Sequence, residues 1–192
     1  ENFKALGIKS EFVKGLNELG IINPTDIQQQ VIPLLLAGNT DLVGQAQTGT
    51  GKTAAFGLPL LHKIDPKKKY VQGLILCPTR ELGQQVAKQL FRFTKYSDKI
   101  FTESVYGGEK IDRQIANLKR TTHIVVATPG RLIDLVNRKA VDISKVKTVI
   151  LDEADEMLSM GFKKELDEIL GFLPEAQSKW LFSATMPQGI KQ

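Results

Sequence analysis

Short and almost continuously apolar runs recur along this chain and alternate with longer helical stretches. Continuous apolar runs are typical of strands that are covered on both faces of a sheet. The runs predict strands at residues 41–43, 73–77, 101–106, 124–127, 148–151 and 180–182. The stretches between them predict helices near residues 52–62, 81–96, 113–119, 130–137 and 163–173.

Strand–helix alternation of this kind implies right-handed crossovers and an α/β fold. We expect an open, mainly parallel central sheet with helices on both faces. No internal repeat, low-complexity tract or Gly/Ser-rich linker divides the 192 residues, which fit one compact domain. In such sheets ligands bind at the carboxyl ends of the strands. The chemical motifs should therefore follow the strands directly.

The composition narrows the class of protein but does not indicate a function. Hydrophobic residues make up 42% and charged residues 24%, which is ordinary for a soluble globular chain. No apolar run reaches membrane-spanning length and no signal-peptide pattern opens the chain, so we expect a cytoplasmic protein without a membrane partner. Cys77 is the single cysteine, which excludes an internal disulfide; its apolar surroundings predict a buried, inert thiol.

The charge balance permits a polyanionic partner without requiring one. The chain has 26 basic and 21 acidic residues, a net charge of +5. Lys67, Lys68 and Lys69 follow Asp65-Pro66, and we favour a solvated loop over a nucleic-acid site for them. The two histidines lack cysteine or acidic neighbours at ligand spacing, so we do not expect a protein-built zinc site.

A glycine-rich loop leads from the first predicted strand into a predicted helix. Its residues are Ala46, Gln47, Thr48, Gly49, Thr50, Gly51, Lys52 and Thr53. The glycines let backbone N–H groups turn toward phosphate oxygens, and the helix N-terminus favours negative charge. Lys52 would neutralise the β- and γ-phosphates of ATP, and the Thr53 hydroxyl would ligate Mg²⁺. Ala46 replaces the usual Gly, but the spacing still predicts a P-loop.

Two adjacent carboxylates, Asp152 and Glu153, follow the predicted strand at residues 148–151. Asp152 would hold Mg²⁺ directly or through water, and Glu153 would position or deprotonate the water that attacks the γ-phosphate. A helix N-cap is the structural alternative, but Asp155 alone could serve as one. The pair therefore predicts a water-activating hydrolase, since neither an acceptor pocket nor a lid for a kinase is evident.

The spelling Asp-Glu-Ala-Asp at residues 152–155 names the DEAD-box RNA helicases, and the chain resembles this family from end to end. The resemblance implies a RecA-like P-loop NTPase domain over residues 1–192, with the family's Q motif within about residues 1–29. Residues 20–28 look like that motif, in which the Gln28 amide would read the edge of adenine. Phe3 lies at the upstream aromatic position and would pack near the base. Without the resemblance, Phe3 would simply be a staple residue near a terminal helix.

Three further segments match the family's RNA-contacting motifs, and each follows a predicted strand. They are Pro78, Thr79 and Arg80; Gly107 and Gly108; and Thr128, Pro129, Gly130 and Arg131. Their N–H groups, hydroxyls and guanidinium groups suit phosphate contacts, so the resemblance implies binding of RNA backbone with little sequence specificity. Gly83 replaces the alanine that is usual in the family.

Ser183 and Thr185 match the family's coupling motif, whose hydroxyls would bond Asp155 and link the γ-phosphate to the RNA face. The resemblance also implies a second RecA-like domain, absent from these 192 residues, that supplies arginine fingers. We therefore expect the chain alone to bind nucleotide modestly, to hydrolyse ATP slowly at best and not to unwind a duplex.

The predicted function is that of an ATP-hydrolysing RNA helicase module. An ATP-gated RNA clamp without processive unwinding uses the same motifs and is the alternative. A DNA-translocating helicase is disfavoured by the Q motif and by the Asp-Glu-Ala-Asp spelling.

Overall fold

The computed structural model describes residues 2–46, 51–173, 176 and 178–185. Six strands form one sheet in the order β1-β6-β5-β2-β4-β3, and every neighbouring pair is parallel. They are β1 (Leu42–Gln45), β2 (Gly73–Leu76), β3 (Thr102–Val105), β4 (Ile124–Ala127), β5 (Thr148–Asp152) and β6 (Ser178–Ser183). The structure confirms all six predicted strands and the parallel sheet.

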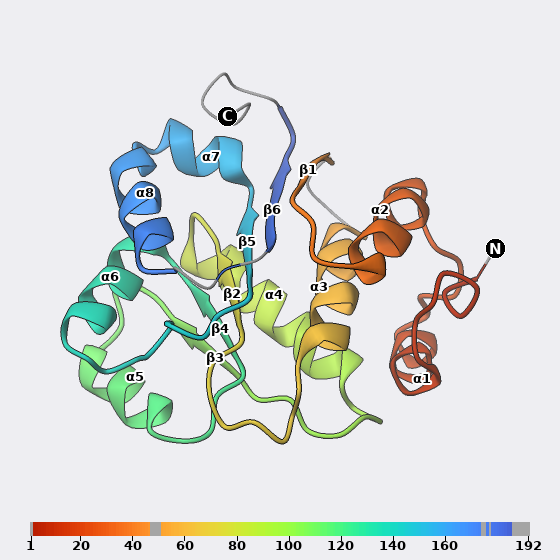
Figure 1. Cartoon of the computed structure of the whole chain (residues 1–192), viewed down its shortest axis with the longest axis horizontal. Helices are drawn as coiled ribbons and strands as arrows, with labels where there is room; N and C mark the ends of the chain where they lie inside the picture. Colours follow the sequence, from red (N-terminus) through yellow and green to blue (C-terminus); the bar gives the residue numbers. More distant parts are fainter. Residues whose placement is uncertain (1, 47–50, 174–175, 177, 186–192) are drawn as a thin grey trace.

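Helices cover both faces of this sheet (Figure 1). One face carries α1 (Ser10–Glu18), α2 (Asp26–Ala37), α3 (Lys52–Lys63) and α4 (Arg80–Phe93), and the other carries α5 (Ile111–Leu118), α6 (Pro129–Asn137), α7 (Ala154–Ser159) and α8 (Lys163–Gly171). The chain moves outward from β1 to β2 and β3 on the first face and returns through β4, β5 and β6 on the second. Right-handed crossovers require this change of face.

The continuous apolar runs fill two separate cores. Ile75 of β2 and Ile150 of β5 belong to the cluster under α1–α4, whereas Leu74 and Val149 belong to the cluster under α5–α8. Successive strand residues point to opposite faces, so each run supplies both cores. All four side chains are fully buried. The prediction of two-sided strands is confirmed for β2, β4 and β5, whereas the edge strands β1 and β3 are only partly buried.

Three sequence predictions outside the site can be compared directly. Cys77 is a buried free thiol, and burial raises its pKa well above the ordinary value, as an inert core cysteine requires. Lys67, Lys68 and Lys69 are all exposed in the α3–β2 connection, which agrees with a solvated loop but does not test the nucleic-acid alternative. No helix within the described residues is long and apolar enough to cross a membrane.

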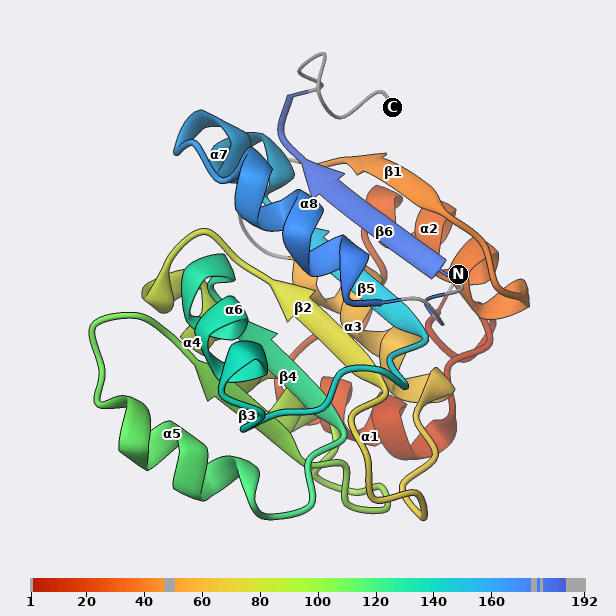
Figure 2. The same ribbon diagram turned by 60° about the vertical axis from the view of Figure 1, so that its left-hand side comes forward.

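Figure 2 shows the carboxyl ends of the strands meeting along one edge of the sheet, where the α7 end of the molecule lies. The chain leaves β1 at Gln45, β2 at Leu76, β4 at Ala127 and β5 at Asp152. Each of these exits opens directly into one of the motifs singled out in the sequence. The topology therefore gathers those motifs at a common edge, as predicted for a parallel sheet.

Candidate functional site

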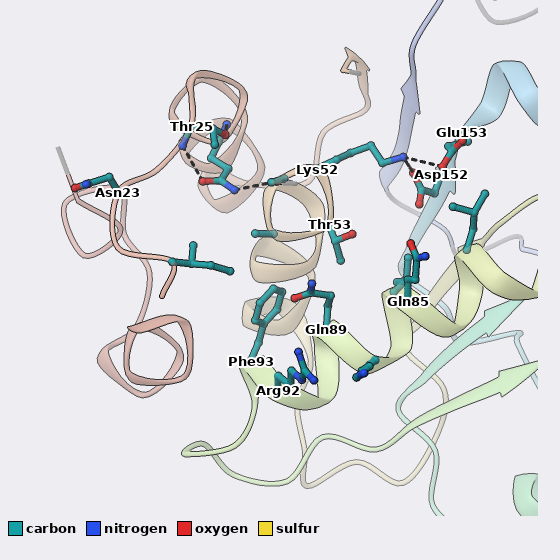
Figure 3. A pocket seen from close by; sticks show the side chains of 17 residues that line it. Asn23, Thr25, Lys52, Thr53, Gln85, Gln89, Arg92, Phe93, Asp152 and Glu153 are labelled. Atoms are coloured by element: carbon teal, nitrogen blue, oxygen red, sulfur yellow. Dashed lines mark hydrogen bonds and ion pairs between the residues drawn. The ribbon is translucent and has the colours of Figure 1, made fainter. Parts of the chain in front are cut away.

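Lys52 lies between the two carboxylates that follow β5 (Figure 3). Its Nζ is 2.8 Å from Asp152 Oδ1 and 3.2 Å from Glu153 Oε2. All three side chains are buried, with residue exposures of 6%, 2% and 9%. Lys52 is the first residue of α3, which follows β1. Because β1 and β5 end at the same edge of the sheet, Lys52 meets Glu153, which lies 101 positions further along the chain.

Glu153 has a backbone conformation that few residues other than glycine adopt. Its φ is 54° and its ψ is 52°, between the end of β5 and the start of α7. A non-glycine residue in the left-handed region costs about 1–3 kcal/mol and is concentrated at functional sites. The turn allows Asp152 and Glu153, neighbours in a chain leaving a strand, to reach the same ammonium group.

Burial and charge shift the pKa values of the central pair. Burial of Lys52 opposes its charge, but the carboxylates of Asp152 and Glu153 outweigh that penalty, and the pKa of Lys52 is raised. Burial raises the pKa of Asp152, and this effect exceeds the lowering caused by Lys52. A cation that joined Asp152 at this point would stabilise its carboxylate form.

Gln28 connects the segment before α2 to the residue before α3. Gln28 Oε1 accepts the Thr25 N–H at 2.9 Å, the Thr25 hydroxyl accepts the Gln28 N–H at 3.4 Å, and together they form a capping box on α2. Gln28 Nε2 donates to the Gly51 carbonyl at 2.9 Å. Gly51 has a φ of 101°, a left-handed angle that suits glycine and turns the chain into α3.

A cavity of about 810 Å³ contains this arrangement. Thr25, Gln28, Gly51, Lys52, Thr53, Asp152 and Glu153 line it together. Gln47, Thr48, Gly49 and Thr50 lie outside the described residues, and Ala46 is half-buried where β1 ends. The structure does not bring Phe3 to the cavity: its side chain is 1% exposed and packs in the core under α1–α4. This placement agrees with a packing role for Phe3 near the terminal helix rather than with packing near a base.

Sequence reasoning missed one wall of the cavity, which comes from α4. Gln85, Gln89 and Arg92 line it, and Figure 3 shows them along one side of that helix, facing Thr53. Spacings of three and four residues place side chains on one helix face. A polar row at 85, 89 and 92 is the signal that could have identified this wall.

The three segments that match RNA-contacting motifs lie together. They follow β2, β3 and β4, which are neighbours in the sheet. The Gly107 N–H donates to Thr128 Oγ1 at 3.3 Å, and an Arg80 guanidinium nitrogen is 3.9 Å from Glu109 Oε1. Gly107, Gly108 and Gly130 are exposed, and Gly108 has a φ of 86°.

The residues of these segments differ in burial and in how many hydrogen bonds they already make within the protein. Pro78 is buried, Pro129 is the first residue of α6, and Thr79 caps α4 by accepting the Leu82 N–H at 3.3 Å. Arg131 is half-buried, and one of its nitrogens donates to the Glu109 carbonyl at 3.0 Å and to Gln114 Oε1 at 2.9 Å. Arg131 therefore braces the loop after β3, while the Arg80 guanidinium is more exposed.

Asp155 contacts both residues of the predicted coupling motif. Its backbone N–H donates to Ser183 Oγ at 3.1 Å, and its Oδ2 accepts the Thr185 hydroxyl and the Thr185 N–H, each at 3.0 Å. Partial burial opposes ionisation of Asp155, but the hydrogen bonds from Thr185 outweigh it and lower the pKa of this carboxyl. The end of β6 is thus tied to the first turn of α7.

A parallel α/β sheet with a buried lysine and two carboxylates at its carboxyl edge defines a RecA-like nucleotide-binding domain. The DEAD/DEAH box helicase family matches residues 25–192, and the chain belongs to this family. The chain is 50% identical over 190 residues to an ATP-dependent RNA helicase CshA of Listeria monocytogenes and 49% identical to a DEAD-box helicase CshA of Streptococcus pneumoniae.

Solved structures agree with this assignment. The chain is similar to a DEAD box protein of Methanococcus jannaschii, with a TM-score of 0.93 and 41% identity over 99% of this chain and 52% of that one. The chain is also similar to a hypothetical ATP-dependent RNA helicase of Sulfolobus tokodaii, with a TM-score of 0.86 and 38% identity. This match covers 96% of this chain and 53% of that one. Each CshA match spans 99% of this chain but only 36% of the relative's own length.

Proposed function

We propose that this chain is the ATP-binding module of an ATP-dependent RNA helicase. The observation that carries the proposal is the burial of Lys52 between Asp152 and Glu153 in a cavity large enough for a nucleotide. Lys52 would exchange its carboxylate contacts for the β- and γ-phosphates of ATP. Ala46–Thr53 would hold the phosphates, and Glu153 would position or deprotonate the attacking water.

The oxygen ligands available here fit magnesium. Asp152 is a buried carboxylate with a raised pKa, and the Thr53 hydroxyl belongs to the same cavity. Mg²⁺ commonly takes one or two protein oxygens and completes its shell with phosphates and water. Magnesium would neutralise charge on the phosphates, and Asp152 and Thr53 would hold it, partly through water.

RNA is the proposed partner of the loops after β2, β3 and β4. The N–H groups at Gly107, Gly108 and Gly130, the Thr79 and Thr128 hydroxyls and the Arg80 guanidinium offer contacts to a phosphate backbone rather than to bases. Asp155, through Ser183 and Thr185, would pass the state of the γ-phosphate to this face. Nothing separately favours an RNA clamp, and the relatives are named helicases, so we propose unwinding as the activity of the whole protein.

The nucleotide site is tested by Lys52→Ala and Glu153→Gln, measured by calorimetric titration with Mg-ATP. We expect Lys52→Ala to abolish measurable binding, because the phosphates lose their buried cation. Glu153→Gln should bind within about threefold of the unmodified chain, because Glu153 acts on water rather than on the nucleotide. Equal ATP affinity in the unmodified chain and Lys52→Ala would refute the site.

Folding must be separated from binding, since Lys52→Ala leaves two buried carboxylates without their cation. Breaking a buried pair costs about 3–5 kcal/mol. Asp152→Asn gives a second measurement, because it keeps a polar partner for Lys52 but loses a magnesium ligand. We expect this variant to bind ATP with little dependence on added Mg²⁺. A magnesium dependence unchanged from the unmodified chain would contradict the assignment of Asp152.

A further inference from the structure

Two connections at the amino ends of β2 and β5 bring five lysines into one surface. Lys67, Lys68 and Lys69 belong to the α3–β2 connection, and Lys145 and Lys147 belong to the α6–β5 connection. All five are exposed. We call them the amino-edge lysines. Figure 2 shows these two connections reaching the sheet side by side, at the end opposite to the nucleotide site.

Specific contacts hold the two connections together. The Lys147 N–H donates to the Gln72 carbonyl at 3.0 Å. The Gln72 side chain is buried, accepts the Asp65 N–H at 2.8 Å and donates to the carbonyls of Asp65 and Lys68 at 2.9 and 3.3 Å. One buried amide therefore fixes the loop that carries three of the lysines.

Tyr70 joins the two groups of lysines at the surface. Lys145 Nζ is 4.7 Å from the centre of its ring, and Lys68 Nζ is 6.0 Å from the same centre. Two ammonium groups thus share one aromatic ring, although they come from different connections. Each contact is a cation–π interaction, which keeps the ammonium at the surface without neutralising it.

Carboxylates of the protein offset the charge of this surface only in part. Among the ion pairs of the described residues, none includes an amino-edge lysine. The nearby Asp65 and Asp142 accept backbone N–H groups of their own loops, from Lys67 at 3.0 Å and Ser144 at 2.9 Å, and Asp142 also interacts with the charge of Lys145.

We propose that the amino-edge lysines and Tyr70 form a second RNA-binding surface, which holds the phosphate backbone of RNA outside the segment bound by the loops after β2, β3 and β4. Clustered like charges repel one another, and a polyanion removes that cost while releasing its own counterions. Tyr70 favours RNA over an acidic polypeptide as the ligand, because a base can stack on its partly exposed ring when a lysine leaves the ring to contact a phosphate. The inference rests on the proposed RNA-binding function.

The test uses the 192-residue chain and a fluorescent oligouridylate of about 20 nucleotides, followed by anisotropy at several salt concentrations. The variant Lys68→Gln/Lys145→Gln removes both ammonium groups over Tyr70. Losing two phosphate contacts should lower the affinity about tenfold at low salt and reduce the slope of log K against log salt by about 1.4. Lys68→Arg/Lys145→Arg keeps the charge and should keep the affinity.

The matched control is Lys4→Gln/Lys164→Gln, which removes two exposed lysines from α8 and the N-terminal segment. It should bind RNA like the unmodified chain, although its net charge is equally reduced. Equal affinity and slope in the patch and control variants would overturn the second surface while leaving the proposed function in place. Failure of the unmodified chain to bind RNA would count against the proposed function itself. Lysine-dependent binding of polyglutamate, with RNA binding unchanged, would overturn the choice of ligand.

Discussion

Single residues in the nucleotide site have structural roles besides the predicted ones. The Gln28 amide caps α2 and bonds the Gly51 carbonyl, and the residue is 1% exposed. An amide has two N–H donors and two acceptor lone pairs, so one of each remains for adenine. The sequence predicted a donor–acceptor pair, but it could not show that Gln28 also fixes the turn into α3. That contact depends on residues 23 positions apart.

Gln28→Glu separates these roles. The acceptor for the Thr25 N–H is kept, whereas the donor to Gly51 and to adenine is lost, and a carboxylate is placed near phosphates. We expect ATP affinity to fall about tenfold or more and the preference for ATP over GTP to disappear. Calorimetry with both nucleotides measures this, and Gln30→Glu, an exposed position on the same helix, controls for charge. Equal affinity of the unmodified chain for ATP and GTP would argue against adenine recognition.

At the scale of elements, the fit of α4 against the end of β3 depends on Gly83. A Cβ added there would lie 2.5 Å from Tyr106 Cε1 and 3.0 Å from its hydroxyl oxygen. Tyr106 is 2% exposed, and burial raises its pKa to about 12. Its ring therefore fills the space that an alanine side chain would need. The position of the Tyr106 ring accounts for Gly83, where the family usually has alanine. Tyr106 also directly precedes Gly107 and Gly108 in the loop after β3.

Gly83→Ala should consequently destabilise the chain, although alanine favours helices by about 1 kcal/mol over glycine. Overpacking costs about 1–3 kcal/mol, so we expect a net loss of about 1 kcal/mol in urea unfolding. In a Tyr106→Leu background the same substitution should be neutral or stabilising, because the ring is gone. A double-mutant cycle measures this coupling. Additive effects would show that the two side chains do not compete for space.

The sequence predicted those elements whose hydrophobic pattern can be recognised within a short segment of the chain. The central strands β2, β4 and β5 are nearly continuous apolar runs, and this pattern needs no knowledge of the rest of the chain. The predicted helices do not include α2, which contains Pro33, although the Thr25–Gln28 capping box marks its start. α7 is short and begins where Glu153 turns in the left-handed region. That turn accompanies the contact of Glu153 with Lys52, 101 positions away, which local propensity does not encode.

On the scale of the whole molecule, the sheet has two distinct ends. The carboxyl ends of the strands carry the proposed nucleotide site and the loops proposed to contact RNA, where polar side chains converge from distant segments. The amino ends carry the amino-edge lysines, whose grouping depends on the pairing of β2 with β5. The sequence predicted the first end because its motifs are contiguous. It could not predict the second, because Lys67–Lys69 and Lys145 meet only after folding.

Both histidines hold connections between elements as neutral rings. His62 Nε2 accepts the Lys9 N–H at 3.1 Å, while Nδ1 bonds the Leu58 carbonyl at 2.8 Å. His123 Nδ1 accepts the Phe101 N–H at 2.9 Å, while Nε2 bonds the Pro66 carbonyl at 3.1 Å. Each ring thus uses one nitrogen as donor and the other as acceptor. A protonated imidazole has no acceptor, so acid would remove one hydrogen bond from each.

Burial lowers the pKa of both histidines, and this outweighs the raising effects of the backbone carbonyls and of Glu11 near His62 and Asp65 near His123. The unfolded chain therefore binds protons first as the pH falls below about 6.5, and stability decreases from there toward the lowered folded-state values. We expect the urea midpoint to fall between about pH 7 and pH 5, above the range in which ordinary carboxylates titrate. In His62→Gln/His123→Gln the midpoint should change less over this range. The same pH dependence in both chains would mean that groups other than the histidines control acid stability.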